Sequence, residues 1–368
     1  MKQHEVFEID NLVSNTEPPG LGNDQEILKV GVVGCGRMGT RRARIVHNSE
    51  GEQLSLLADI NLERLDVLTE ELGCRSVTDW HDVVENDDID IVLVSVPNKY
   101  MAPVIVAALD AGKHVLCEKP PGRNQAEACQ IVAAAERAAG TFKIGFDKRY
   151  HPAMRKMREL FLQGLIGPVM YGRAIFGHGA SPGLEKTWFA SAELAGGGAM
   201  IDMGVHLVDL LRWYMGDFER ALGVVKTYYW DLDYFQSGQQ VDDNAFFLLQ
   251  TDEGKVAQVH VSWTQWKNRF SFEIFGRDGF LRMEGLGGYY GPSTMTLARR
   301  RPESGPPVTE VFEFNQQFNT LELEWYDFVE SVRKGEQDIQ KARDGLKTMR
   351  TIDALYRSAV SGETEAIH

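Results

Sequence analysis

The sequence predicts an α/β fold in two domains: a doubly wound parallel sheet, then an α+β domain with a large, open, mainly antiparallel sheet. From residue 29 to about 146, short β-rich runs alternate with helical windows, the pattern of parallel strands joined by right-handed crossovers. After Pro152 the strand candidates alternate in polarity, which favours antiparallel pairing. The 368 residues can form two cores. We place the domains at residues 29–149 and 150–368, after a polar N-terminal extension at residues 1–28.

The first strand of the first domain leads into a glycine motif. An apolar run at residues 30–33 is followed by Gly34-Cys35-Gly36-Arg37-Met38-Gly39 and a helix-compatible segment. This order is typical of the dinucleotide-binding turn of a Rossmann domain, in which the glycines allow a sharp turn, a close pyrophosphate and close helix packing. The predicted cofactor contacts here are Gly34, Gly36, Arg37, Met38 and Gly39. Taken alone, the motif also fits a glycine-rich turn without a ligand.

The second strand ends in an acidic residue. Further strands are expected at residues 54–58, near Ser76, and at residues 89–95, 114–117 and 142–145. Asp59 follows the first of these, twenty residues beyond Gly39, where a carboxylate can accept hydrogen bonds from both hydroxyls of an adenosine ribose. This position favours NAD, while the nearby Asn61 and Arg64 leave NADP open as the alternative cofactor. An ordinary loop aspartate is the other interpretation of Asp59.

Two later strands of this domain also end in residues that can serve a nicotinamide enzyme. Ligands of open α/β sheets bind beyond the carboxyl ends of the strands. The residues expected at this cleft are Ser95, Pro97, Asn98, Glu118 and Lys119. A partly desolvated lysine at the mouth of an apolar strand can polarise a substrate oxygen or exchange a proton with it. A solvated loop lysine is the alternative.

The second domain contains a glycine loop that opens a helix. Its strands are expected at residues 170–177, 222–230, 245–251, 256–264 and 270–275, and a structural helix at residues 346–358. Between them, Gly196-Gly197-Gly198 precedes Asp202 and His206. Residues four apart lie on one face of a helix, so the carboxylate can orient the imidazole or pass a proton to it. Asp209 continues that face, and a capping aspartate with a satisfied core histidine remains the alternative.

Two further motifs of the second domain have structural interpretations. The aromatic run at residues 228–235 is assigned to packing across a sheet or an interface rather than to a carbohydrate platform. Asp242 and Asp243 are interpreted as a solvated strand entry, because no histidine or further acidic ligand lies nearby at metal-site spacing. No metal site is predicted.

Composition excludes several classes of partner. Thirty-nine basic and fifty-three acidic residues give a net charge of −14, which disfavours binding to nucleic acid or to an anionic membrane. We find no apolar segment of membrane-spanning length and no signal peptide. The four cysteines lack metal-site spacing and are expected to be buried thiols in a reducing compartment. The sequence therefore predicts a cytoplasmic protein.

Together these motifs resemble the Gfo/Idh/MocA oxidoreductase family, the group of glucose-fructose oxidoreductase and inositol dehydrogenase, from residue 29 to about 361. The matching motifs follow the family's order: Gly34 to Gly39, Ala58-Asp59, Pro97-Asn98, Glu118-Lys119-Pro120, and Asp202 to Asp209. The resemblance implies that Lys119, Asp202 and His206 form the catalytic group. It also implies a homodimer or homotetramer formed through the second sheet.

The resemblance extends to the crossover between the domains. It implies that Arg149 and Tyr150, beside Lys148, line the substrate cleft. Trp188 is similar to a family tryptophan that packs against a sugar face, and a core aromatic is the equal alternative. The chain departs from the pattern at Met101, where many members have a histidine, so this residue cannot donate a proton.

The expected reaction is hydride transfer between a secondary hydroxyl carbon of a sugar, sugar derivative or cyclitol and the nicotinamide. In oxidation, His206 would take the hydroxyl proton with the help of Asp202, and Lys119 would stabilise the oxygen. One alternative is that tightly bound NAD oxidises the substrate transiently, allowing epimerisation, elimination or glycoside cleavage. A noncatalytic NAD-binding scaffold is disfavoured, because it would not need these proton-transfer groups.

Overall fold

The computed structural model describes residues 26–236, 238–316, 318–337 and 339–368. Residues 1–25 of the predicted N-terminal extension lie outside this range. The chain divides into two compact units, each described here by itself. The Rossmann unit comprises the described residues up to Asp147 together with Asn319–Leu346. The sheet unit comprises Lys148–Phe318 and Lys347–His368.

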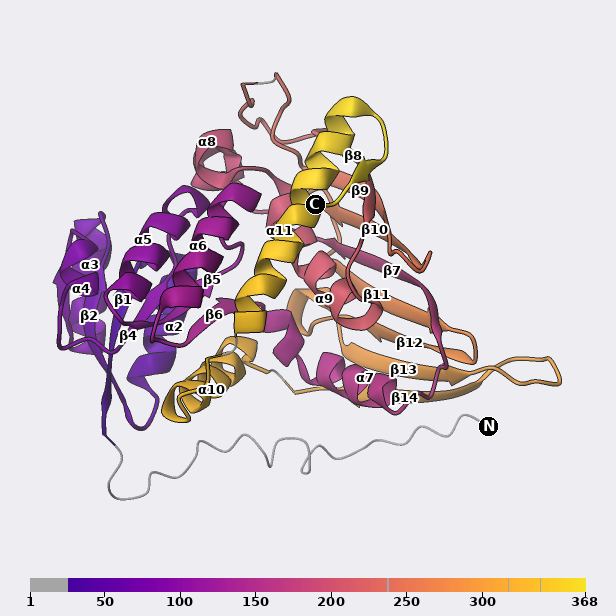
Figure 1. Cartoon of the computed structure of the whole chain (residues 1–368), viewed down its shortest axis with the longest axis horizontal. Helices are drawn as coiled ribbons and strands as arrows, with labels where there is room; N and C mark the ends of the chain where they lie inside the picture. Colours follow the sequence, from indigo (N-terminus) through magenta and orange to yellow (C-terminus); the bar gives the residue numbers. More distant parts are fainter. Residues whose placement is uncertain (1–25, 237, 317, 338) are drawn as a thin grey trace. The chain divides into compact units, whose positions relative to one another are not determined.

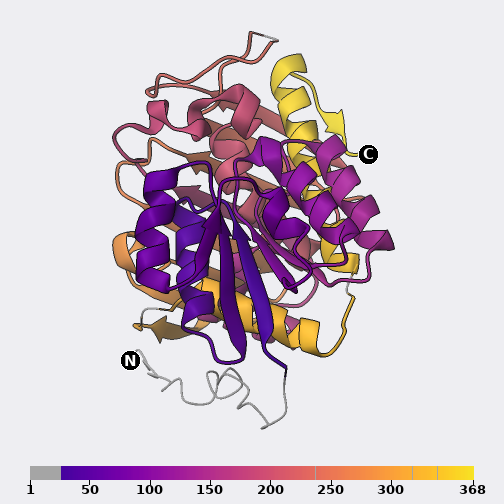
Figure 2. The same cartoon turned by 90° about the vertical axis from the view of Figure 1, so that its left-hand side faces the viewer.

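The Rossmann unit is built on a six-stranded parallel sheet in the order β3-β2-β1-β4-β5-β6, flanked by helices (Figure 2). This strand order is that of a dinucleotide-binding fold. Its strands are β1 (Leu28–Val33), β2 (Glu52–Ala58), β3 (Arg75–Val77), β4 (Ile91–Val94), β5 (His114–Glu118) and β6 (Phe142–Gly145). Its helices are α2 (Arg37–His47), α3 (Leu62–Leu72), α4 (His81–Val84), α5 (Asn98–Asp110), α6 (Gln125–Arg137) and α10 (Thr320–Arg333).

Helix α10 joins the Rossmann unit from a distant part of the sequence. Its Trp325, Phe328, Val329 and Val332 are buried in the same core cluster as Val30 of β1. The predicted boundary therefore differs from the observed one, because residues 319–346 group with the first unit rather than with residues 150–318. The burial of these apolar side chains against the parallel sheet explains the return of the chain.

The sheet unit contains a nine-stranded sheet in the order β14-β13-β12-β11-β7-β10-β9-β8-β15. Neighbouring strands pair antiparallel except β7 with β10, which confirms the predicted mainly antiparallel sheet. Its strands are β7 (Val169–Gly177), β8 (Arg220–Lys226), β9 (Asn244–Gln250), β10 (Val256–Ser262), β11 (Arg269–Gly276), β12 (Gly279–Glu284), β13 (Ser293–Arg299), β14 (Val308–Phe314) and β15 (Glu365–Ala366).

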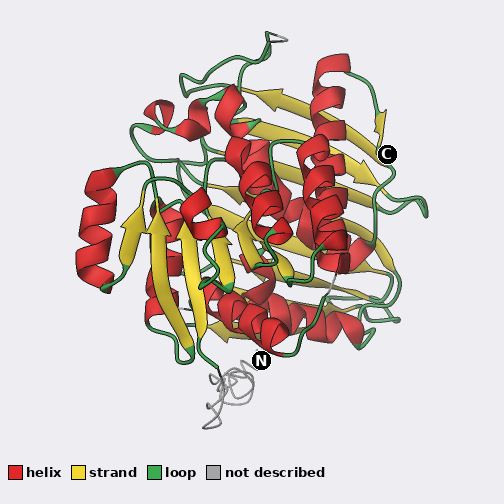
Figure 3. Cartoon of the chain, turned by 60° about the vertical axis from the view of Figure 1, so that its left-hand side comes forward, coloured by secondary structure: helices red, strands yellow, loops and turns green. Residues whose placement is uncertain are grey.

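Helices cover one face of this sheet (Figures 1 and 3). They are α7 (Pro152–Leu162), α9 (Val205–Met215) and the part of α11 (Ile339–Ser361) that belongs to this unit. Along β9 the exposure alternates, so that Phe247 and Leu249 are buried while Phe246 and Leu248 are exposed. The sheet therefore has a covered face and an open face.

One helical run corrects a prediction about apolar segments. Residues Ala192–Met215 include α8 (Ala192–Ala195), a π-helical turn, η4 (Met200–Gly204), and α9. By length and composition this run could cross a membrane, and 83% of the tested window is buried inside the protein. The prediction that no apolar segment reaches membrane-spanning length is therefore wrong for this run, which is buried in the core of the sheet unit.

Candidate active site

The glycine turn of the Rossmann unit has the geometry of a phosphate cradle. Gly34 has a φ of 88°, and a Cβ on Gly39 would lie 1.8 Å from the carbonyl oxygen of Gly34. A Cβ on Gly36 would meet no atom within 4 Å. Gly36 is the N-cap of α2, so no side chain caps the first N–H groups of this helix. Arg37 and Met38 form the first turn of α2. The helix N-terminus next to open space over Gly36 fits a dinucleotide pyrophosphate.

Asp59 lies directly after β2 and is bonded to this turn. Its Oδ2 accepts a hydrogen bond of 2.7 Å from the backbone N–H of Cys35, and its Oδ1 accepts one of 2.8 Å from Asn61. The guanidinium of Arg64 lies 3.1 Å from Oδ2, and its side chain is 43% exposed. The carboxylate thus stands at the predicted ribose position, with a cation beside it that can also attract a 2′-phosphate.

The next two parallel strands bring the remaining predicted cofactor residues to the same edge of the sheet. Ser95 follows β4, donates from its N–H to the carbonyl of Val33, and has a buried Oγ without a hydrogen-bond partner among the described residues. Pro97 is the N-cap of α5 and Asn98 its first residue. Lys119 follows β5 and is half-buried. The structure therefore places Gly34, Asp59, Ser95 and Lys119 at one sheet edge.

The side chain of Glu118 points into the interior. Its carboxylate lies 2.6 Å from Nε of Arg42, whose Nη2 lies 2.8 Å from Glu324 of α10. All three residues are buried. Burial raises the pKa of Glu324 to about 7, and the charge of Arg42 opposes this rise. Glu118, predicted as a cofactor contact, is thus engaged through its side chain by Arg42 and tied to α10.

In the sheet unit, Asp202 and His206 lie on consecutive helical elements, η4 and α9. Oδ2 of Asp202 accepts a hydrogen bond of 3.3 Å from the indole Nε1 of Trp263. His206 is 5% exposed, and its ring meets Phe176 edge-on at a centroid distance of 6.1 Å. π-Helical turns inside α-helices are frequent at functional sites. The predicted pair is therefore on one continuous helical segment, bordered by aromatic rings.

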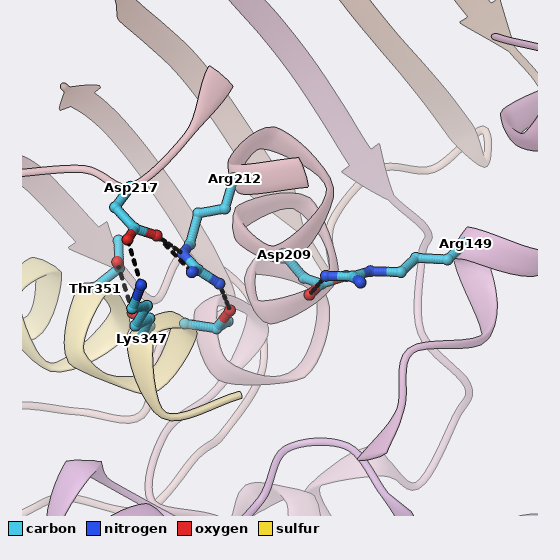
Figure 4. Close-up of polar contacts among 7 residues, drawn as sticks. Arg149, Asp209, Arg212, Asp217, Lys347 and Thr351 are labelled. Atoms are coloured by element: carbon cyan, nitrogen blue, oxygen red, sulfur yellow. Dashed lines mark hydrogen bonds and ion pairs between the residues drawn. The ribbon is translucent and has the colours of Figure 1, made fainter. Parts of the chain in front are cut away.

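Two arginine contacts fix the rest of α9 (Figure 4). Arg149 makes a bidentate pair with the buried Asp209, with distances of 2.7 and 2.6 Å. Arg212 donates to Asp217 at 2.5 Å, and Asp217 also accepts from Lys347 at 2.5 Å. Asp209, expected on the face of Asp202 and His206, is thus paired with an arginine that the sequence analysis placed in the substrate cleft. Bidentate pairing fixes the guanidinium plane of Arg149.

The aromatic residues near Asp202 form a cluster. Trp188 stacks on Phe189 with a centroid distance of 3.9 Å, and Phe189 meets Trp263 edge-on at 6.5 Å. Tyr150 ends the short helix η1 (Asp147–Tyr150) and is half-buried. Met101, at the position of the family histidine, is buried in α5. The structure thus connects Trp188 to Asp202 through two aromatic side chains.

Three interpretations of the sequence were wrong. Asp242 and Asp243 are fully buried rather than solvated, because backbone N–H groups surround their carboxylates. Strand β8 ends at Lys226 rather than at Trp230. In the bend that follows, Tyr228 and Tyr229 are more than 60% exposed, so these two residues do not pack across the sheet, and packing at an interface stays a prediction. Two of the four cysteines, Cys74 and Cys129, are only half-buried.

Three residues of this region were not predicted to have a role in it: Trp263, Asp242 and Glu324. Trp263 falls inside the predicted strand at residues 256–264, and only its contact with Asp202 distinguishes it from a core aromatic. The adjacent pair Asp242-Asp243 offered a signal, since two carboxylates at a strand entry need many donors if they are buried. Glu324 offered none, because its partner Arg42 is 282 residues away.

Comparison with known proteins matches both units to one family. Residues 28–146 match the model of the oxidoreductase family with an NAD-binding Rossmann fold, and residues 154–282 match the Gfo/Idh/MocA C-terminal domain. The chain belongs to the Gfo/Idh/MocA family. The predictions of family, fold class, NAD(P)-dependent enzyme and NAD-binding Rossmann domain are therefore confirmed.

Relatives extend over most of the chain. A levoglucosan dehydrogenase of Pseudarthrobacter phenanthrenivorans is 26% identical over 61% of this chain and 63% of that protein. Inositol 2-dehydrogenase 3 of Saccharopolyspora erythraea is 26% identical over 91% of this chain and 94% of that protein. A solved structure of levoglucosan dehydrogenase in complex with NADH shares the fold, with a TM-score of 0.81 and 22% identity over 93% of this chain and 99% of that one.

Proposed function

We propose that this chain is an NAD(P)-dependent dehydrogenase that transfers a hydride between a secondary hydroxyl carbon of a sugar or cyclitol and the nicotinamide. The observation that carries the proposal is the placement of Asp202 and His206 on one helical segment of an NAD-binding oxidoreductase. The names of the relatives support a sugar or cyclitol as the substrate, because one acts on levoglucosan and another on inositol.

The Rossmann unit supplies the groups that hold the cofactor. Gly36, Arg37 and Met38 offer backbone to the pyrophosphate, and Asp59 accepts hydrogen bonds from the adenosine ribose. The nicotinamide, when bound, supplies the hydride acceptor or donor at its C4. Ser95, Pro97, Asn98 and the Glu118 to Lys119 segment are proposed to border the nicotinamide half.

Three side chains are proposed to act on the substrate. In oxidation the carbinol carbon loses a hydride, its hydroxyl loses a proton, and a C=O bond forms. His206 takes the proton at an imidazole nitrogen, and Asp202 stabilises the imidazolium that results. Lys119 donates a hydrogen bond to the oxygen as its negative charge develops. In reduction the same groups act in the opposite direction, and His206 returns the proton to the oxygen.

Arg149, Tyr150 and Trp188 are proposed to bind the substrate. The pair with Asp209 holds the guanidinium of Arg149 in one plane, which gives this cation a fixed orientation at the proposed substrate cleft. The indole of Trp188 offers an apolar face to the C–H groups of a sugar ring. These contacts would orient one hydroxyl carbon among several similar ones.

A second copy of the chain is proposed to cover the open face of the nine-stranded sheet. This face combines exposed apolar side chains, Phe246 at 41% and Leu248 at 44%, with charged pairs such as Arg173 with Glu273. Self-complementary surfaces of this composition suit a two-fold interface. The acidic balance of the chain and its free cysteines also support a reducing, cytoplasmic location.

The proposal is tested by absorbance at the NADH band. Purified protein and NAD or NADP are challenged with a panel of aldoses, anhydrosugars, sugar acids and inositols. We expect net reduction with one class of polyol. The variants Lys119→Ala and His206→Ala should each lower turnover at least ~10²-fold while cofactor binding stays unchanged, because proton transfer contributes this much. Full activity of both variants on the same substrate would contradict the catalytic assignment.

A further inference from the structure

We propose that Trp263 is a positioning residue for Asp202, and that the buried pair Asp242-Asp243 holds both ends of this contact. The inference rests on the proposed function, since it concerns the carboxylate that assists His206. It gives a role to two motifs that the reaction itself does not use: the paired aspartates before β9 and the tryptophan after β10.

The contact itself joins a rigid donor to a carboxylate of the proposed site. The indole Nε1–H of Trp263 donates to Oδ2 of Asp202 at 3.3 Å. Trp263 is 1% exposed and meets Phe189 edge-on, so the indole plane is held by packing. A rigid indole N–H fixes the direction of the carboxylate oxygen that it meets. Trp263 can therefore set the direction in which Asp202 presents its carboxylate to the proposed site.

Asp243 fixes Trp263 through the main chain. The backbone N–H of Trp263 donates to the carbonyl of Asp243 at 2.8 Å, and the carbonyl of Trp263 accepts from the indole of Trp230 at 3.0 Å. The carboxylate of Asp243 in turn accepts from the backbone N–H groups of Tyr228, Tyr229 and Trp230. The bend that carries Trp230 is thus held by the same residue that holds Trp263.

Asp242 fixes the turn from which Asp202 projects. Its carboxylate accepts from the N–H of Gly198 at 3.0 Å and of Met200 at 2.7 Å, and from the hydroxyl of Tyr356 at 2.7 Å. A Cβ on Gly198 would lie 1.8 Å from the carbonyl oxygen of Asp242. The carbonyl of Gly198 accepts from the N–H of Asp202 at 3.0 Å. Backbone and side chain of Asp202 are therefore anchored by adjacent residues, Asp242 and Asp243.

The variant Trp263→Phe tests the contact, because it removes the N–H and keeps an aromatic ring. We expect kcat to fall about tenfold, the typical effect of losing a hydrogen bond to a charged group, with the KM for NAD unchanged. The acid limb of the kcat pH profile reports the imidazole of His206, which must be neutral to accept the proton. This limb should move to higher pH, because a carboxylate that has lost a donor stabilises the imidazolium more strongly. A purely structural role would lower thermal stability without moving this limb.

A matched control is Trp325→Phe. Trp325 is also 1% exposed, and its indole N–H donates to Ser49 at 3.1 Å inside the Rossmann unit. This variant should lose stability and keep the kcat and the pH profile of the wild type. If Trp263→Phe fails to fold, Tyr356→Phe provides a second variant, because it removes one of the donors to Asp242. We expect it to lower kcat severalfold without raising the KM for NAD.

A double-mutant cycle separates this inference from the proposed function. In an Asp202→Asn background, Trp263→Phe should cause no further loss of kcat. If Asp202→Asn is inactive but Trp263→Phe behaves like Trp325→Phe, or if the two losses simply add, the positioning role is overturned. If Asp202→Asn itself retains full activity, the proposed function fails and the positioning role fails with it.

Discussion

The buried and half-buried carboxylates of this protein differ in their donors, and the donor suits each one to a different task. Asp209 has an arginine and serves as a fixed ion pair. Asp242 has backbone N–H groups and the hydroxyl of Tyr356, and burial raises its pKa to about 6. Asp202 accepts from an indole, while Asp59 accepts from the glycine turn and also pairs with Arg64. A bidentate ion pair with an arginine fixes both side chains, whereas backbone and indole N–H groups fix the direction of the carboxylate oxygen that they meet.

The carboxylate of Asp59 should contribute to cofactor affinity. Asp59→Ala should weaken NAD binding about tenfold to a hundredfold, because hydrogen bonds to a charged group contribute ~1.5–3 kcal/mol. NADP binding should weaken less, since Arg64 remains and the repulsion of a 2′-phosphate is removed. Titration of protein-bound NADH and NADPH fluorescence measures both. Glu63→Ala serves as the control, because it changes an exposed residue of α3, the helix that carries Arg64. An equal loss of NAD and NADP affinity in Asp59→Ala would contradict the assignment of Asp59.

Glu324 predicts a pH dependence of stability. Its pKa is about 7 in the folded protein against an ordinary 4.5, so between these values the folded state binds more protons than the unfolded state. Stability from this group is fully present below pH 4.5 and is lost as the pH rises through 7. The Gln variant cannot titrate at this position, so it does not lose this stability. From pH 5 to pH 8, the unfolding free energy of Glu324→Gln minus that of wild type should therefore rise by about 1–3 kcal/mol.

Urea unfolding at the two pH values measures this difference. Glu330→Gln changes an exposed residue of the same helix, paired only at the surface with Lys334, and its difference from wild type should stay within about 0.5 kcal/mol at both pH values. If the difference in unfolding free energy between Glu324→Gln and wild type is the same at both pH values, the carboxylate does not titrate in this range.

At the scale of elements, the sequence predicted best those strands whose signal is local. Strands β1, β2, β4 and β5 are buried apolar runs, and the residues at their ends are set by the parallel topology. Residues 319–346 fall in the predicted second domain but group with the Rossmann unit, because no local pattern shows which of two cores a segment packs against. The roles of Asp242 and Trp263 depend on contacts between distant segments, which no spacing rule encodes.

The attachment of α10 to the Rossmann unit can be tested by its packing. Phe328 is fully buried in the cluster that contains Val30 and Trp325. Phe328→Ala should therefore destabilise the unit by about 3–5 kcal/mol in urea unfolding, the cost of a large cavity. Leu62→Ala changes a side chain that is 62% exposed in the same unit and should cost less than about 0.5 kcal/mol. A loss below 1 kcal/mol for Phe328→Ala would contradict this packing.

At the scale of the whole molecule, the open face of the nine-stranded sheet predicts self-association. Wild-type protein should sediment as a dimer or tetramer, and Leu248→Asp should shift it toward the monomer by placing a charge in the apolar part of the face. Tyr289→Asp changes a side chain that is 95% exposed on η5 (Gly288–Tyr290) and should leave the assembly intact. A monomeric wild-type protein, or no change on Leu248→Asp, would place the interface elsewhere or exclude it.

Direct hydride transfer is the central claim, and an isotope label tests it most directly. A polyol that turns over is prepared with deuterium at the carbinol carbon, and the reduced cofactor is examined by mass spectrometry. We expect the deuterium to pass to the nicotinamide in net stoichiometric amounts, with a lower rate for the labelled substrate. Release of the label to solvent, or return of all label to an epimerised or cleaved product, would contradict a net dehydrogenase.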